Sequence, residues 1–227
     1  MTPLQKIAMG LVIVLVPAYF PAHPHPAWAV YDAVPDPVGW ALVVAGVWAL
    51  GRNSELDLTV VKWLAVLALL VSIPLWLPQV NHLLVPKYNS SITVSIQWSV
   101  SLPQTAFSLM LARIIGQAGQ FHEPRDTYVA GRFGVLTWGF LLCAILPAVA
   151  YGADVENLQR PTLVLIGLVN VVFIFYLFMT NRRDFLGGPG PRDWTSRFAP
   201  KQPGTTQEGR PERDGPPDGT SIRRRPR

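Results

Sequence analysis

This sequence has almost no cysteine and none of the common catalytic motifs. The chain of 227 residues contains one cysteine, Cys143, so neither an intramolecular disulfide nor a multi-cysteine metal site can form. It contains no GxxxxGK[ST] phosphate loop, no HExxH zinc motif and no GxSxG nucleophile elbow. These absences disfavour the nucleotide-driven, zinc-protease and serine-hydrolase classes, and a non-enzyme is the favoured expectation.

Charged residues are also scarce, at 15% of the chain, whereas half of the residues are hydrophobic. The hydrophobic residues stand in long runs separated by short polar stretches, which is typical of membrane spans. We therefore predict an all-α, multi-pass protein of the cell membrane, a bundle of about six transmembrane helices. The predicted spans cover residues 7–20, 38–51, 55–80, 91–112, 133–151 and 161–180.

No Asp, Glu or His lies in the apolar interior of a predicted span. Proton- and ion-coupled carriers generally need ionisable groups at that depth, because these groups carry the coupling charge. Such a carrier is therefore disfavoured, although backbone carbonyls can also bind Na⁺.

The basic residues predict the orientation, because Lys and Arg are enriched in cytoplasmic loops. With six spans, only Lys87 and Arg160 fall on the outer side, which places the N-terminus and the C-terminus in the cytoplasm. The basic residues on the cytoplasmic side are Lys6, Arg52, Arg113, Arg125, Arg132, Arg182 and Arg183.

The fourth span has two interpretations. Residues 91–101 alternate apolar and polar side chains, which is typical of a β-strand in a soluble protein. If this segment did not cross, the following arginines would lie outside, against the positive-inside bias. We therefore predict a helix with Ser and Thr on more than one of its faces.

The first apolar run is either a retained span or a cleaved signal peptide. Ala27-Trp28-Ala29 resembles a signal-peptidase site, but the stretch from Pro17 to Ala29 is long and proline-rich for a cleavage region. A retained first span is the favoured interpretation.

Tryptophan and tyrosine gather near both predicted membrane boundaries, as expected for interfacial side chains. The outer belt comprises Trp28, Trp40, Trp76 and Tyr151, and the inner belt comprises Trp48, Trp63, Trp138 and Tyr176.

Two local patterns concern the second and third spans. Ala41, Ala45 and Ala49 form a ladder of small residues that would let a neighbouring helix approach closely. Ser54 and Asp57 resemble a capping box that opens the third span.

After Thr180 the composition changes. Up to that residue the chain has eight basic and eight acidic residues, whereas residues 181–227 have eleven and six, with seven Gly and eight Pro. Such a segment cannot bury enough surface to offset the entropy of ordering, so we predict a disordered basic cytoplasmic tail. The charge of this tail does not indicate nucleic-acid binding. Arg223–Arg227 could contact anionic lipid, but a solvated tail is favoured.

The candidate site is a polar face of the fourth span, whose members fall within about 80° of one another at 100° per residue. Asn170, in the sixth span, is the expected partner. These side chains are predicted either to hydrogen-bond between helices, the favoured reading, or to line a solute cavity beside Pro103. The face comprises Thr93, Gln97, Ser101, Gln104 and Ser108.

Two histidine-containing segments are weaker candidate sites. His23 and His25 are weak candidates for a metal, because the Pro-His-Pro-His-Pro string imposes no ligand geometry. Residues 122–126 combine His, Glu, Arg and Asp, but sequence neighbours cannot all converge on one substrate. No metal and no cofactor is expected.

The leading functional hypothesis is a non-catalytic accessory, scaffold or sensor protein that acts through helix contacts and its tail. Its expected partners are the lipid bilayer, another membrane protein or a second copy of the chain. The alternative is a channel or uncoupled carrier for a small polar solute, lined by the fourth span. A membrane enzyme acting on lipid is the third hypothesis.

Overall fold

Helices account for the regular structure of the chain in the computed structural model, which describes residues 1–16, 36–76, 91–153 and 155–190. No strand occurs among these residues, so the prediction of an all-helical fold is confirmed for them. The elements are α1 (Pro3–Leu15), α3 (Asp36–Asn53), α4 (Thr59–Trp76), α6 (Ser91–Phe121), α7 (Thr127–Gly152), α8 (Glu156–Thr180) and the 3-10 helix η1 (Asp184–Leu186).

The segment with strand-like alternation is the first part of α6, which continues through Pro103. At the end of this segment, the hydroxyl of Ser101 donates to the carbonyl of Trp98 at 2.8 Å. One turn later in α6, the hydroxyl of Thr105 donates to the carbonyl of Ser101 at 3.2 Å. Bonds of this kind satisfy hydroxyl groups without a partner outside the helix. A run rich in Ser and Thr can therefore be helical in an apolar environment.

Three helical segments are long and apolar enough to cross a membrane, namely α4, α7 and residues Asn157–Thr180 of α8. The apolar helix α1 is shorter, since its 13 residues rise only about 20 Å against a hydrocarbon thickness of about 30 Å. By length and composition, these three helices could span a membrane, in agreement with the predicted membrane protein.

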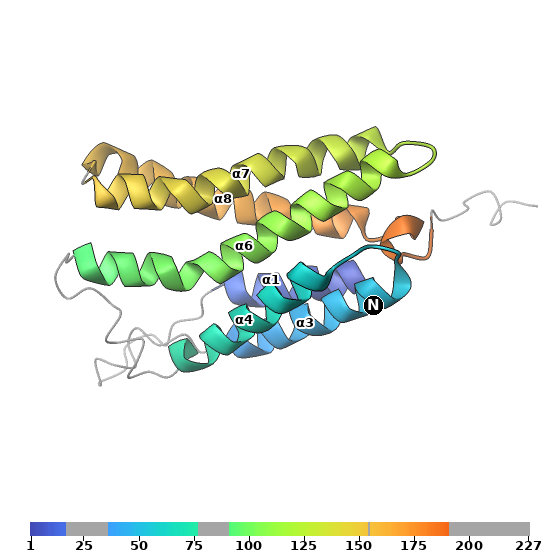
Figure 1. Cartoon of the computed structure of the whole chain (residues 1–227), viewed down its shortest axis with the longest axis horizontal. Helices are drawn as coiled ribbons and strands as arrows, with labels where there is room; N and C mark the ends of the chain where they lie inside the picture. The colour runs from blue at the N-terminus through green and yellow to red at the C-terminus, as the bar shows by residue number, and fades with distance from the viewer. Residues whose placement is uncertain (17–35, 77–90, 154, 191–227) are drawn as a thin grey trace, which may run out of the picture. The chain divides into compact units, whose positions relative to one another are not determined.

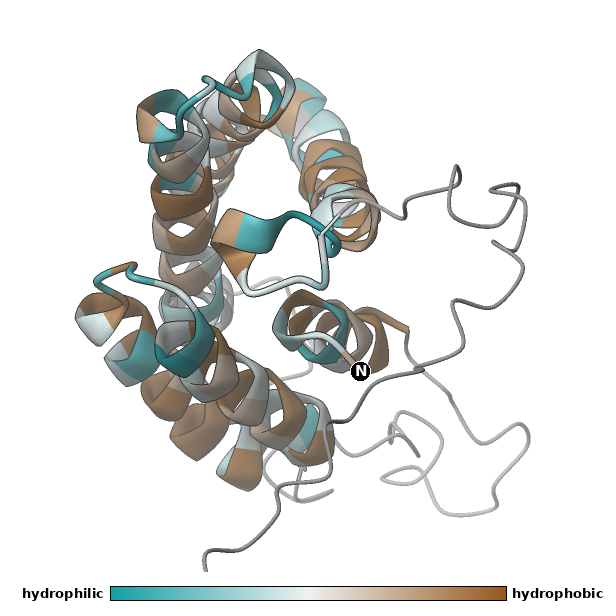
Figure 2. Ribbon diagram, turned by 90° about the vertical axis from the view of Figure 1, so that its right-hand side faces the viewer, coloured by the Kyte–Doolittle hydropathy of each residue, from teal (hydrophilic) through white to brown (hydrophobic). Residues whose placement is uncertain are grey.

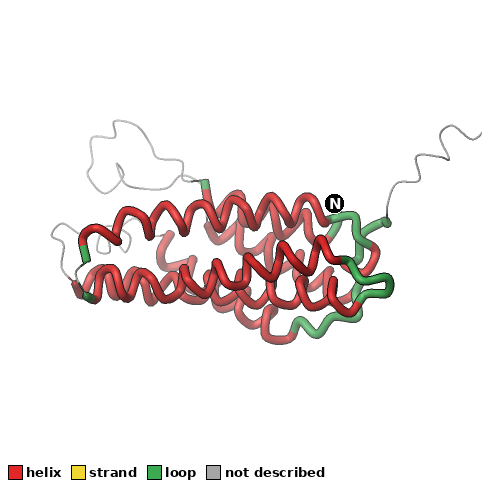
Figure 3. Tube along the Cα trace, turned by 90° about the horizontal axis from the view of Figure 1, so that it is seen from above, coloured by secondary structure: helices red, strands yellow, loops and turns green. Residues whose placement is uncertain are grey.

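The helices form a ring in chain order, in which each packs against the next and α8 packs against α1. Consecutive helices run antiparallel, as Figure 1 and Figure 3 show. Figure 2 views the ring along the helices. The N-terminus, the turns at 54–58 and 122–126, and η1 lie at one end of the ring, here named the ordered end.

Aromatic side chains fill much of the interior. Phe107 and Phe173 are fully buried, and Phe173 contacts the edge of Phe140 at a centroid distance of 5.1 Å. Trp40 contacts Phe107 edge-on at 5.4 Å and is only 2% exposed. The ring of Trp40, a residue predicted for the outer aromatic belt, therefore packs in the core, where edge-to-face contacts stabilise it.

Other members of the predicted belts are on the surface. Trp63 and Trp138 are 71% and 70% exposed, and Trp48 is also exposed. Tyr176 is half-buried against Phe133. Trp28 lies outside the described residues.

The closest helix packing joins α1 and α3 through glycines. A Cβ atom added to Gly10 would lie 2.5 Å from the carbonyl oxygen of Gly39, and one added to Gly46 would lie 2.7 Å from Cγ1 of Ile7. Small residues permit such an approach. The predicted alanine ladder does not make this contact, because Ala41 and Ala45 are exposed on another face of α3.

The helix starts differ in part from those predicted. Ser54 donates its hydroxyl to the carbonyl of Leu50 at 2.7 Å, so it ends α3 and does not open α4. Asp57 accepts a hydrogen bond from the backbone N–H of Thr59 at 3.1 Å. Hydrogen bonding from the backbone and the side chain of Thr59 holds the pKa of the Asp57 carboxyl below its usual value. A reciprocal capping box does occur at α1, between Thr2 and Gln5.

The compact unit extends past the predicted boundary at Thr180, to Pro191. Leu186 in η1 is fully buried. Gly187 adopts φ of +70°, and a Cβ atom there would lie 2.8 Å from that of Asn53 at the end of α3. Burial of an apolar side chain orders the first residues of the predicted tail, while residues from 191 onward lie outside the described part.

Candidate functional site

The predicted polar face of α6 is only partly within the described side chains, because those of Thr93 and Gln97 lie outside them. Ser101 is exposed, Gln104 is half-buried, and Ser108 is fully buried. The members therefore differ in environment along the helix, from the surface at Ser101 to the core at Ser108.

Ser108 is the member with the most unusual environment. Its hydroxyl oxygen has no hydrogen-bond partner in the described part of the chain. Next to it in sequence, Phe107 is also fully buried and contacts Trp40. A buried hydroxyl without a partner costs free energy, so this site is either a local defect or a point where a small polar molecule binds.

Asn170, the expected partner of this face, has a hydrogen bond within its own helix. Its side-chain amide donates to the carbonyl of Ile166 at 2.9 Å, within α8 itself. Helix α8 packs mainly against α7 and α1, whereas α6 packs mainly against α7 and α4. One interhelical hydrogen bond of α6 joins the indole N–H of Trp98 to the carbonyl of Ala144 in α7, at 3.1 Å.

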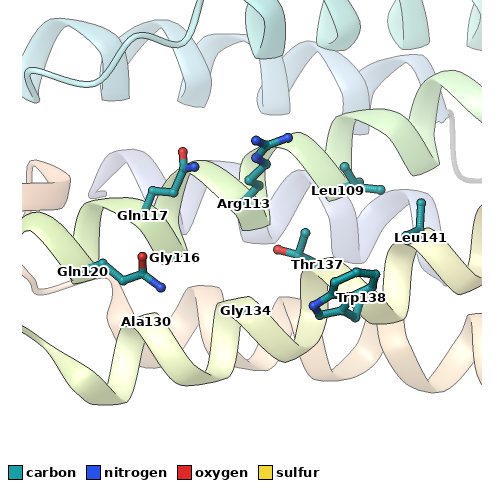
Figure 4. Close-up of a pocket in the computed structure, with 10 residues that line it drawn as sticks. All are labelled: Leu109, Arg113, Gly116, Gln117, Gln120, Ala130, Gly134, Thr137, Trp138 and Leu141. Atoms are coloured by element: carbon teal, nitrogen blue, oxygen red, sulfur yellow. The ribbon is translucent and has the colours of Figure 1, made fainter.

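An open groove lies on the outer side of the α6–α7 pair, with a volume of about 420 Å³ (Figure 4). Gly116, Ala130 and Gly134 have little or no side chain, and their shortness creates the depression between the two helices. A Cβ atom added to Gly134 would have no other heavy atom within 4 Å. The groove is thus a real gap in the packing that a larger residue could fill.

The two ends of this α6–α7 groove differ in chemistry. Arg113, Gln117 and Gln120 line it on α6, at positions separated by one turn each. Trp138 and Leu141 line the part that lies toward the middle of α7. Figure 4 shows Gln120 reaching toward α7, whereas Arg113 and Gln117 extend away from α7 along the α6 rim of the groove. Trp138 and Leu141 lie on the side of the groove away from Gln120. The sequence patterns did not predict this groove, because it depends on which faces of α6 and α7 meet.

The ordered end is held together by polar and aromatic contacts. Asp126 accepts from the backbone N–H of Val129 at 3.1 Å and caps α7, and its other oxygen lies 3.2 Å from Nε of Arg183. His122 stacks on Phe185 at a centroid distance of 4.5 Å. His122 and Asp126 therefore connect the turn at 122–126 to the segment that follows α8.

Arg132 adds a further contact near this end. Its guanidinium carbon lies 5.6 Å from the ring centroid of Tyr128 and 5.9 Å from that of Tyr176, within the range of cation–π attraction. The contact links α7 to α8 by a basic residue that was predicted to lie on the cytoplasmic side.

Among the described residues, no group of three or more His, Cys, Asp or Glu side chains could hold a metal ion. The weak metal candidates His23 and His25 lie outside those residues.

Comparison with known proteins finds no matching protein family, curated protein or solved structure. A functional proposal therefore depends on the geometry of this chain alone.

Proposed function

We propose that the protein is a six-span cell-membrane protein, with both ends in the cytoplasm, that acts without catalysis as a scaffold, accessory or sensor protein. The ring of six antiparallel helices supports an even number of crossings, because the N-terminus and the end of α8 share the ordered end. Arg125 and Arg132 also lie at or near that end, in agreement with the positive-inside bias.

The observation that carries the scaffold function is the attachment of the C-terminal segment to the ordered end. Arg183, Phe185 and Leu186 are fixed by an ion pair, a ring stack and full burial, respectively. The contacts involve the ends of three different helices, so residues 181–190 start the basic tail from a defined point. A binding segment that begins at a fixed point is held close to its membrane-associated partner, which raises its effective concentration.

The solute-pathway alternative draws support from Ser108. Its buried hydroxyl without a described partner is compatible with a polar molecule inside the ring. Against this alternative, Phe107 and Trp40 occupy the interior beside it. A pathway would need both rings to move, and the scaffold function needs no such motion.

A pull-down in mild detergent compares the full chain with a variant that ends at Pro191, both carrying an N-terminal tag. The scaffold function predicts a stoichiometric membrane-protein or self-associated partner on the full chain, reduced at least tenfold on the shortened one. Reconstitution into liposomes provides the opposing measurement. Flux of a small polar solute above that of empty liposomes, abolished by Ser108→Leu, would contradict the scaffold function and support the alternative.

A further inference from the structure

The α6–α7 groove combines a cation, amide donors, an interfacial aromatic residue and an apolar end within one depression. Its polar end has Arg113, Gln117 and Gln120, and no carboxylate is among the described residues that line it. A guanidinium and side-chain amides together favour an anionic oxygen-rich group such as a phosphate. The polar end of the groove thus indicates a negatively charged ligand group of the phosphate type.

The other end indicates that the ligand also has an apolar part. Leu109, Trp138 and Leu141 line this end, and Trp138 is 70% exposed on the outer surface of the ring. Tryptophan at a membrane–water boundary lies at the level of the lipid headgroups, with its ring against acyl chains. Along α6, Leu109 precedes Arg113 by one turn and so lies deeper toward the middle of the helix.

We propose that this groove binds one anionic phospholipid, with the headgroup phosphate at Arg113 and the two glutamines and an acyl chain along Leu109, Trp138 and Leu141. The sequence of polar and apolar lining residues matches the sequence of headgroup and chain in such a lipid. In the proposed orientation this lipid belongs to the inner leaflet. The binding site itself does not depend on that orientation. The lipid fills a gap that Gly116 and Gly134 leave between the helices, so it completes the packing of the α6–α7 pair.

Two glycines of α7 offer a matched pair of variants. Cβ atoms added to Gly131 or Gly134 would have no other heavy atom within 4 Å, so both positions are open where a side chain begins. Only Gly134 lines the groove. Gly134→Leu should block the site, and Gly131→Leu should leave it open. Arg113→Gln removes the cation, with Arg125→Gln as its control, because Arg125 is exposed in the turn and does not line the groove.

Native mass spectrometry of the purified full chain measures lipid binding directly. The protein in detergent is titrated with phosphatidylglycerol or phosphatidylcholine, and bound lipids are counted. We expect one retained phosphatidylglycerol with at least fivefold preference over phosphatidylcholine. Arg113→Gln should weaken the binding about fivefold to tenfold, as loss of one interfacial charge contact implies. Gly134→Leu should abolish the retained molecule, while both control variants bind as the unchanged protein does.

Three results would overturn the assignment. Undiminished phosphatidylglycerol binding by both Arg113→Gln and Gly134→Leu would show that the lipid binds elsewhere. Equal retention of the two lipids would exclude recognition of the anionic headgroup. Displacement of the bound lipid by an equal concentration of inorganic phosphate would show that the groove takes a free phosphate. Melting temperatures within about 2 °C of the unchanged protein confirm that the variants are folded.

Discussion

Replacing Gly10 with alanine should force α1 away from α3 and destabilise the helical ring. The added Cβ atom would lie 2.5 Å from the carbonyl oxygen of Gly39 and 3.0 Å from the backbone nitrogen of Val43. Both neighbours are backbone atoms, so no side-chain rotation relieves the contact. The helices must separate by several tenths of an ångström, which loosens the packing on both sides of Gly10.

The magnitude follows from two opposing terms. Overpacking costs about 1–3 kcal/mol, and two backbone contacts place this site toward the upper value. Alanine recovers about 1 kcal/mol relative to glycine in a helix, which leaves a net loss of about 1–2 kcal/mol. For a chain of this length the expected decrease in Tm is about 2–8 °C.

Thermal unfolding in detergent measures the effect, with Gly167→Ala as the matched control. A Cβ atom at Gly167 would have no other heavy atom within 4 Å, so the helix term alone remains and the stability should rise by up to about 1 kcal/mol. The same substitution is thus expected to have opposite signs at the two sites. Equal or increased stability of the Gly10 variant would refute the packing of α1 against α3 described above.

Three further changes test the ordered end and the core. A chain that ends at Pro191 should keep the Tm of the full chain, whereas one that ends at Asp184 loses the fully buried Leu186 and should melt several degrees lower, in the same assay. Asp126→Ala removes a helix cap and should cost about 1 kcal/mol of unfolding free energy, while Asp126→Asn keeps the cap and should cost less. Ser108→Ala should stabilise the protein by up to about 1 kcal/mol, since it removes a buried hydroxyl without a described partner; a loss of stability would instead show that this hydroxyl is bonded.

The positions of the helices were the most predictable feature of the fold. Long apolar runs predicted α4, α7 and α8, and the charge bias correctly chose a helix for residues 91–112 despite their strand-like alternation. These inferences succeed because a chain in hydrocarbon must satisfy its backbone hydrogen bonds locally, which leaves a helix as the simplest solution.

The sequence did not predict which face of each helix packs against other helices. In a soluble protein the polar face of a helix shows which side is buried, but lipid and protein core are both apolar. The sequence therefore did not show that Trp40 packs on Phe107. It also predicted a close approach at the alanine ladder, whereas Gly39 and Gly46 are the residues that face α1. Only the helix partners, known from the structure, identify the glycines that face a neighbour.

The candidate site shows the same limit. The helical wheel placed Ser101, Gln104 and Ser108 on one face of a helix, but it could not reveal that Ser108 is fully buried whereas Ser101 is exposed. Nor could it show that Asn170 bonds within its own helix. The α6–α7 groove depends on which faces of two helices meet, and no pattern within one helix contains that information.

The orientation of the chain in the membrane is tested most directly by cysteine labelling in intact cells. Single cysteines at Asn89 and at Glu123 are introduced after Cys143→Ala and exposed to a membrane-impermeant maleimide. Six spans with both ends in the cytoplasm predict that Asn89→Cys reacts from outside, while Glu123→Cys reacts only after the membrane is permeabilised. Reaction of Glu123→Cys in intact cells would contradict the six-span orientation on which the proposed function is built.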